Sequence, residues 1–289
     1  MRHIKPYSQL FENTQELTQE QKDWLDKCTF DGSWSVNPQT GLVDVNGTFS
    51  CEGQILRDFK GVRFGDVVGD FACSANSLTS LEGAPHSVGV DFHCYHNSLT
   101  SLEGAPQKVG GDFDCSHNSI TSLEGAPQIV DGDFNCEENQ ITTLEGAPRE
   151  IDGDFDCHDN QLTSLEGAPR SVGGSFFCSY NSLTSLKGAP QIVDGDFDCH
   201  NNQLTSLEGA PQKVGNGFDC EDNPITEWVI QIILNEMSNR EIQLEQAVKE
   251  LWDEIPEEDR IYLAKHHPDL PPDEKRGYEA LARHKKRLI

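Results

Sequence analysis

Apolar residues recur along most of this chain at a fixed interval. Phenylalanine and cysteine flank one variable position in an F-x-C segment. Nine such cysteines are separated by 22 residues once and by 21 thereafter: Cys51, Cys73, Cys94, Cys115, Cys136, Cys157, Cys178, Cys199 and Cys220. From the second copy on, asparagine follows each cysteine at plus three and Leu or Ile at plus five. The shared pattern is V-x-G-x-F-x-C-x-x-N-x-L-T-S-L-x-G-A-P.

This period predicts a stack of repeated units. A short fixed period of this kind is typical of one supersecondary unit that buries its apolar face against neighbouring copies. The alternation in F-x-C predicts a short strand with Phe and Cys on one side, and Gly-Ala-Pro predicts the turn that ends each unit. Stacked units then form a parallel sheet with strands about 4.8 Å apart. We expect the asparagine column to satisfy backbone groups at the strand ends.

The pattern resembles the leucine-rich repeat L-x-x-L-x-L-x-x-N-x-L, with Phe and Cys in two leucine places. The short period and the Gly-Ala-Pro ending resemble the compact leucine-rich repeats of bacteria and their phages. The resemblance covers residues 65–227 and implies a leucine-rich-repeat-like solenoid, horseshoe-shaped, that binds a partner. The first leucine place departs from the family pattern, because Gly, Val or Asp stands there with Val or Ile one position earlier.

Residues 1–64 are expected to cap the solenoid, since an uncovered end repeat would expose its core. Thr18 and Gln21 match a capping box at the start of a helix near residues 18–28. Two short strands around a turn at 37–41 are expected to follow. The cap then ends in an irregular first repeat.

Residues 228–289 are expected to form a C-terminal helical region. Apolar residues at helical spacing predict a helix from about residue 225 that plugs the solenoid. Further helices are expected near 241–254, 257–266 and 273–287. The last contains a basic cluster, which either docks a partner or complements the helix dipole.

Acidic residues dominate the composition. The chain has 49 acids and 22 bases, a formal net charge of −27, and residues 65–224 hold 26 of the acids and 5 of the bases. This charge would repel nucleic acid and anionic lipid, so we expect neither to bind directly. The chain shows no export signal after Met1 and no apolar run of about 18 residues. We therefore expect a cytoplasmic protein.

Positions three before and one before each cysteine are predicted to point outward. There they align carboxylates in two columns, and these are the candidate partner-binding residues: Asp70, Asp91, Asp112, Asp114, Asp133, Asp154, Asp156, Asp196, Asp198 and Asp219. Two carboxylates about 4.8 Å apart repel by about 0.9 kcal/mol at the dielectric of water. Either function requires these aspartates, or each caps a tight turn and was copied with the repeat. Both explanations stay open.

The cysteine column is interpreted as a series of small buried residues. Parallel thiols do not point at one another as a disulfide requires, which favours a reducing compartment. Cys94 and His93 point to opposite sides, and His96 with His117 supplies only two ligands, so we expect no zinc site. Calcium-binding repeats carry G-G-x-G-x-D turns, of which only a fragment occurs here. We predict no cofactor, and a divalent cation stays an alternative.

The sequence contains no G-x-S-x-G, phosphate-loop or H-E-x-x-H motif, so we predict no enzyme. The leading hypothesis is a protein-protein interaction module whose acidic sheet face binds a basic partner surface. The first alternative is a phage-type DNA mimic that inhibits a host nucleic-acid-binding protein such as a defence nuclease. Two full carboxylate columns would place one charge per about 2.4 Å, against about 1.7 Å in duplex DNA. The second alternative is a small enzyme or effector with activity in the C-terminal helices.

Overall fold

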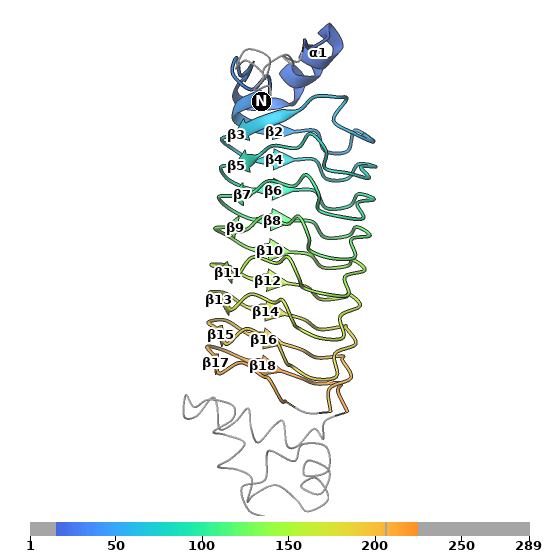
Figure 1. Ribbon diagram of the computed structural model, residues 1–289, viewed down its shortest axis with the longest axis vertical. Coiled ribbons are helices and arrows are strands. Elements are labelled where there is room, and N and C mark those ends of the chain that lie inside the picture. Colours follow the sequence, from blue (N-terminus) through green and yellow to red (C-terminus); the bar gives the residue numbers. More distant parts are fainter. Residues whose placement is uncertain (1–15, 206, 225–289) are drawn as a thin grey trace, which may run out of the picture. The chain divides into compact units, whose positions relative to one another are not determined.

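The computed structural model describes residues 16–205 and 207–224 (Figure 1). The chain divides into two compact units. The first comprises the described residues up to Gln140 together with Gly146–Pro148, and the second comprises Ile141–Glu145 and the described residues from Arg149 onward. Stacked parallel strands make each unit a β-solenoid, as the period predicts. The helices expected from residue 225 onward lie outside the described residues.

An N-terminal helix, α1 (Gln19–Cys28), covers the start of the first unit. Thr18 is its N-cap: the Thr18 Oγ1 accepts a hydrogen bond from the Gln21 backbone N–H at 3.2 Å, and the Gln21 Oε1 accepts one from the Thr18 N–H at 2.8 Å. This reciprocal pair confirms the predicted capping box. The indole of Trp24 packs edge-on against Phe49, with ring centroids 5.3 Å apart. The helix therefore covers the first ring of the phenylalanine column.

A hairpin joins this helix to the solenoid and confirms the two predicted strands. β1 (Thr29–Val36) pairs antiparallel with β2 (Val43–Ser50). β2 also starts the parallel ladders, because Phe49 lies opposite Phe71 in the next coil. β3 (Phe64–Val67) pairs with another part of β2. β2 is therefore both the last strand of the cap and the first strand of the parallel ladders.

Two ladders of short strands run through the first unit. The phenylalanine ladder continues from β2 through strands that each begin at a phenylalanine: β4 (Phe71–Ala72), β6 (Phe92–His93), β8 (Phe113–Asp114) and β10 (Phe134–Asn135). The valine ladder continues from β3 through strands that each end in a valine: β5 (Ser87–Val88), β7 (Lys108–Val109) and β9 (Ile129–Val130). In both ladders from β5 and β6 onward, each residue lies opposite its equivalent in the next repeat.

The second unit repeats this arrangement. Its phenylalanine ladder consists of β12 (Phe155–Asp156), β14 (Phe176–Phe177), β16 (Phe197–Asp198) and β18 (Phe218–Asp219). Its second ladder consists of β11 (Glu150–Ile151), β13 (Ser171–Val172), β15 (Ile192–Val193) and β17 (Lys213–Val214). The valine ladders are a difference from the sequence analysis, which assigned one strand to each repeat. A strand such as β7 buries only Val109, so it lacks the alternation that buried Phe and Cys give the other ladder.

The core of each coil contains the side chains that the repeat aligns. Phe113 and Cys115 are fully buried, as are Ile120 and Leu123 from the rest of the same coil. Successive phenylalanine rings stack along the ladder, with 5.5 Å between the centroids of Phe92 and Phe113. Burial of Phe and Cys with the intervening residue half-exposed confirms the predicted alternation.

The asparagine column holds neighbouring coils together. The Asn118 Nδ2 donates to the carbonyl oxygens of Cys94, Cys115 and Ser116, each at 3.1 Å. Its Oδ1 accepts from the Leu99 backbone N–H at 3.0 Å. The side chain thus serves four backbone groups in two coils, as we expected from its place after the strand. Full sets of the same bonds occur at Asn76, Asn97, Asn139, Asn181, Asn202 and Asn223.

The Gly-Ala-Pro segment forms the predicted turn. Gly125 has a φ of 89°, which glycine adopts readily and other residues rarely do. A Cβ atom here would lie 2.8 Å from the carbonyl oxygen of Leu102 in the preceding coil. The turn therefore needs glycine both for its backbone angle and for the close approach of two coils.

No helix in the described ranges has the length and apolar character needed to cross a membrane.

Candidate functional site

The first aspartate column precedes the phenylalanine strands, and in the first unit it consists of Asp70, Asp91, Asp112 and Asp133. The carboxylates of Asp70, Asp91 and Asp112 each reach along the stack to the next coil. The Asp91 Oδ1 accepts from the Asp112 backbone N–H at 2.8 Å, and the Asp112 Oδ1 accepts from the Asp133 N–H at 2.8 Å. A hydrogen bond to a charged group contributes about 1.5–3 kcal/mol. This exceeds the repulsion of about 0.9 kcal/mol between adjacent carboxylates in water.

The same contact occurs in the second unit with a different acceptor. The Asp154 Oδ1 accepts from the Ser175 N–H at 2.6 Å, and the Ser175 Oγ accepts from the Asp196 N–H at 3.1 Å. At the start of the column, the Thr48 Oγ1 accepts a hydrogen bond from the Asp70 N–H at 3.3 Å. A hydroxyl therefore makes the contact that a carboxylate makes elsewhere. The position requires a hydrogen-bond acceptor but no negative charge.

The second aspartate column lies one residue before each cysteine and forms local turns. The Asp114 Oδ1 accepts from the Ser116 N–H at 2.9 Å. Neutral Asn135 makes the equivalent bond to the Glu137 N–H, also at 2.9 Å. Asx turns of this kind suit asparagine and aspartate equally. This turn uses an acceptor without needing a charge, and Phe177, which lies opposite Asp156 and Asp198, shows that the column tolerates a side chain with no acceptor at all.

The ten predicted partner-binding aspartates are divided equally between the two units. In the first unit, consecutive coils bring together Asp70, Asp91, Asp112, Asp114 and Asp133. In the second, the corresponding set is Asp154, Asp156, Asp196, Asp198 and Asp219. Their side chains are partly exposed, for example 31% for Asp91 and 20% for Asp198. Each set is accessible to a partner, although carboxylates such as those of Asp112 and Asp198 also accept a backbone hydrogen bond.

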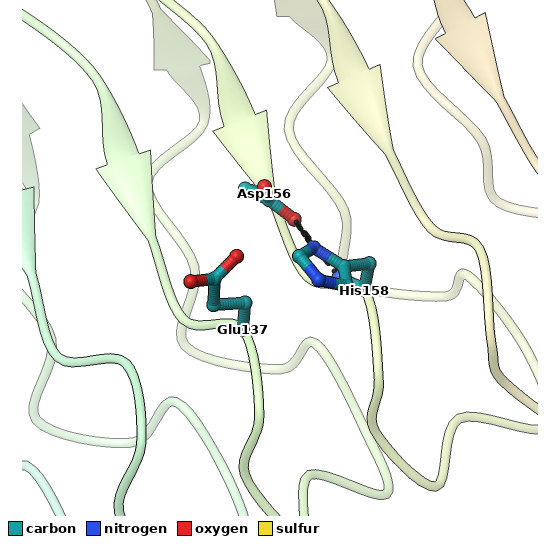
Figure 2. A group of neighbouring side chains, drawn as sticks. All are labelled: Glu137, Asp156 and His158. Carbon is teal, nitrogen blue, oxygen red and sulfur yellow. Dashed lines mark hydrogen bonds and ion pairs between the residues drawn. The ribbon is translucent and has the colours of Figure 1, made fainter. Parts of the chain in front are cut away.

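Two aspartates of the second column also bind a histidine side chain. The His158 Nδ1 lies 2.7 Å from the Asp156 Oδ1 (Figure 2). The His200 Nδ1 lies 2.5 Å from the Asp198 Oδ1 in the same way. In both cases the imidazole folds back over the Asx turn formed by the aspartate two positions earlier. The Asp-Cys-His sequence thus determines the ring's position.

His200 also has a second carboxylate nearby. Asp219 on β18 lies directly opposite Asp198 on β16. One ligand atom from each of Asp198, His200 and Asp219 lies within 4.8 Å of the others. This cluster was not expected from the sequence, where the histidines had been considered as zinc ligands only together with cysteines or with one another. The available signal was a D-x-H sequence whose aspartate recurs at the same position of the next repeat.

Two histidines of the first unit, His96 and His117, lie side by side. The rings of His96 and His117 stack with their centroids 4.2 Å apart, and the His117 Nδ1 lies 2.9 Å from the Glu138 Oε2. Neither His96 nor His117 belongs to a group of three close metal-ligating residues in the part of the chain that the structure describes.

The thiols are core groups, as the sequence predicts. All ten cysteines are buried, and none of them forms a disulfide. Burial raises the pKa of the Cys51 thiol to about 12 and raises the pKa of Cys94 well above its usual range. Cys28 in α1 accepts a hydrogen bond from the Gln54 Nε2, and burial raises its pKa too. Thiols in this state are uncharged at neutral pH, whereas nucleophiles and metal ligands must be thiolates.

A scan against protein families and a search of the curated proteins found no match to this chain. Its architecture is established by its own period and strand register. It is a repeat protein in which successive repeats, one coil each, stack as a parallel β-solenoid.

Proposed function

We propose that this protein is a non-catalytic interaction module whose aspartate columns bind a basic surface on a protein partner. The observation that carries the proposal is the difference between what the fold requires and what the chain contains. Ser175, Thr48 and Asn135 supply the necessary acceptors without charge. Aspartate nevertheless occupies most copies of the first column. A fold that accepts neutral residues at these positions does not require this excess of negative charge, whereas a cationic partner would use it.

The charge distribution supports the same partner chemistry. Residues 65–224 hold 26 acids and 5 bases, so the repeats carry most of the net charge of −27. Complementary charge accelerates association and excludes partners of like charge. A backbone N–H holds one oxygen of the carboxylates of Asp70, Asp91, Asp112, Asp154 and Asp196, so these side chains are ordered before binding. Less side-chain entropy is then lost in the complex.

The DNA-mimic alternative has weaker support in this geometry. Each unit aligns five aspartates over four coils, as Asp70, Asp91, Asp112, Asp114 and Asp133 do in the first. With coils about 4.8 Å apart, this gives one charge per about 3.8 Å, less than half the density of duplex DNA at one per about 1.7 Å. The second column is too often neutral, at His93 and Asn135 for example, to supply the rest.

We also infer that the repeat is a variant of the compact leucine-rich repeats of bacteria and their phages, and that the protein works in a reducing cytoplasm. The asparagine at the end of each strand, with its bonds to three carbonyls, supports the first inference. Ten buried thiols without a disulfide support the second. An activity in the C-terminal helices concerns residues outside those described.

Capture of a partner from host lysate tests the proposal with two matched triple variants. The column variant carries Asp91→Asn, Asp112→Asn and Asp133→Asn, which keep the acceptor oxygens and remove three charges. The control variant carries Glu82→Gln, Glu103→Gln and Glu124→Gln, which remove the same charge from exposed positions in the Leu-Glu-Gly turns. Because only the column carboxylates would face the partner, we expect the column variant to lose at least about tenfold in affinity, or 1.4 kcal/mol. The control variant should bind as the wild type does.

The captured protein should be basic and should elute as salt rises, because salt screens exposed charges. Equal binding by the two variants would contradict the proposal and would locate the contact elsewhere. Capture of a nuclease or repressor that duplex DNA displaces would instead support the mimic.

A further inference from the structure

We propose that Asp198, His200 and Asp219 form a binding site for a divalent transition-metal ion of the zinc class. The site lies in the second unit where β16 and β18 pair, and this proposal does not depend on the partner-binding function. The cluster combines an imidazole nitrogen with two carboxylates, which is a donor set that carboxylates alone do not provide.

The strand register places the ligands on one side of the ladder. Asp198 and Asp219 are opposed residues of adjacent parallel strands, so their side chains leave the sheet in the same direction. His200 follows Asp198 by two positions, and its ring folds back so that Nδ1 faces the Asp198 carboxylate. Ligand atoms of all three residues lie within 4.8 Å of one another. Ligands in a tetrahedral zinc site stand about 3.4 Å apart, given bonds of about 2.0–2.2 Å. Side-chain shifts of about 1 Å would therefore complete the coordination.

Backbone hydrogen bonds already orient both carboxylates. The Asp198 Oδ1 accepts from the His200 N–H at 3.0 Å, and the Asp219 Oδ1 accepts from the Glu221 N–H at 2.9 Å. The Tyr180 ring packs edge-on against the His200 imidazole, with centroids 5.0 Å apart. Ligands held in this way lose little conformational freedom when a cation binds. Outer-shell contacts of this kind commonly support metal ligands.

The donor set selects the class of ion. Imidazole nitrogen suits Zn²⁺, Ni²⁺ and Cu²⁺, whereas Mg²⁺ and Ca²⁺ prefer oxygen ligands throughout. Two carboxylates on adjacent strands repel by about 0.9 kcal/mol in water, and a cation between them replaces this repulsion with attraction. The imidazole must be neutral to bind metal, so affinity should fall as the pH is lowered.

Histidine NMR of the full chain titrated with Co²⁺ tests the site. Co²⁺ is a paramagnetic substitute for Zn²⁺, and the ring signals of His200 are identified by their loss in His200→Gln. We expect His200 to show the strongest broadening or shift among the 10 histidines at substoichiometric Co²⁺, and Zn²⁺ to reverse it. Loss of an outer-shell partner alone weakens metal affinity about 10–100-fold. Asp219→Asn, which removes a ligand, should therefore raise the Kd at least about tenfold.

Asp196→Asn is the matched control, because it removes the same charge from a position outside the cluster, in the coil that contains Asp198 and His200. Each asparagine keeps the acceptor oxygen of the residue that it replaces. In Asp219→Asn the asparagine can still accept from the Glu221 N–H, and in Asp196→Asn it can still accept from the Gly217 N–H. We expect Asp196→Asn to leave the Kd for Co²⁺ within about twofold of the wild type, since an exposed charge outside the coordination sphere contributes little. The proposal is overturned if His200 does not respond to Co²⁺. It is equally overturned if the two variants weaken binding by the same factor, because the ion would then be attracted only by the general negative charge.

Discussion

Replacing Phe176 with alanine is expected to lower the free energy of unfolding by about 3–5 kcal/mol. The ring is fully buried and stacks between Phe155 and Phe197, with centroid distances of 5.4 and 5.5 Å. Ladder hydrogen bonds fix the coils on both sides, so the backbone cannot close the cavity that alanine leaves. Denaturant unfolding followed by circular dichroism measures the loss.

The neighbouring residue provides the control. Phe177 occupies the same strand, β14, but points to the opposite side and is half-exposed. Phe177→Ala removes the same group and should cost about 1 kcal/mol or less, because it leaves little buried void. If the two substitutions were equally destabilising, the assignment of inner and outer faces would be wrong.

Asn139→Ala should destabilise the first unit by about 3 kcal/mol or more, since each unsatisfied buried polar group costs about 1–3 kcal/mol. The buried Asn139 side chain donates to the carbonyl oxygens of Cys115, Cys136 and Glu137 at 3.0–3.2 Å. It also accepts from the Ile120 N–H at 3.0 Å. Alanine leaves all four backbone groups without this partner. The shift of the thermal unfolding midpoint measures the effect.

Gln140→Ala is the control for this substitution, because its side chain is exposed and adjacent in sequence. It should change stability by no more than about 0.5 kcal/mol. A similar loss in Gln140→Ala would show that the effect arises from the loop and not from the asparagine's hydrogen bonds.

The stacking and its register could be predicted because a strict period aligns identical residues. When every phenylalanine lies one full repeat from the next, pairing Phe92 with Phe113 is the arrangement that buries all rings and all thiols together. The role of asparagine followed from its fixed place at a strand end, where carbonyl groups need donors. The N-terminal helix was predictable for a different reason, since Thr18 and Gln21 form a local capping motif.

The valine ladder could not be predicted because a strand such as Ser87–Val88 has no second buried residue two positions from its valine, whereas each phenylalanine has a buried cysteine there. A single buried valine gives no alternation, and its pairing comes from the return path of the coil.

The direction in which the aspartate side chains point could not be predicted from the sequence either. An outward carboxylate and one that caps the next coil occupy the same sequence position, and only geometry separates them. Asp112 does both, so the two explanations considered for the columns are compatible.

The His200 cluster required three kinds of information at once. The turn at Asp198 folds the imidazole back, the register brings Asp219 alongside, and the alternation places both carboxylates on the same side. The sequence contains each of these features separately. Their coincidence appears only when the coils are stacked, which explains why metal binding was not expected from spacing alone.

Amide hydrogen exchange at Asp133 tests most directly the central claim that first-column aspartates stack in register and cap the next coil. Its N–H donates to the Asp112 Oδ1 at 2.8 Å. We predict that Asp112→Ala accelerates exchange of this amide at least about tenfold, equivalent to 1.4 kcal/mol of local protection. Asp112→Asn keeps the acceptor and should leave exchange nearly unchanged. Rapid exchange of the Asp133 amide in the wild type, or equal acceleration in both variants, would contradict the account.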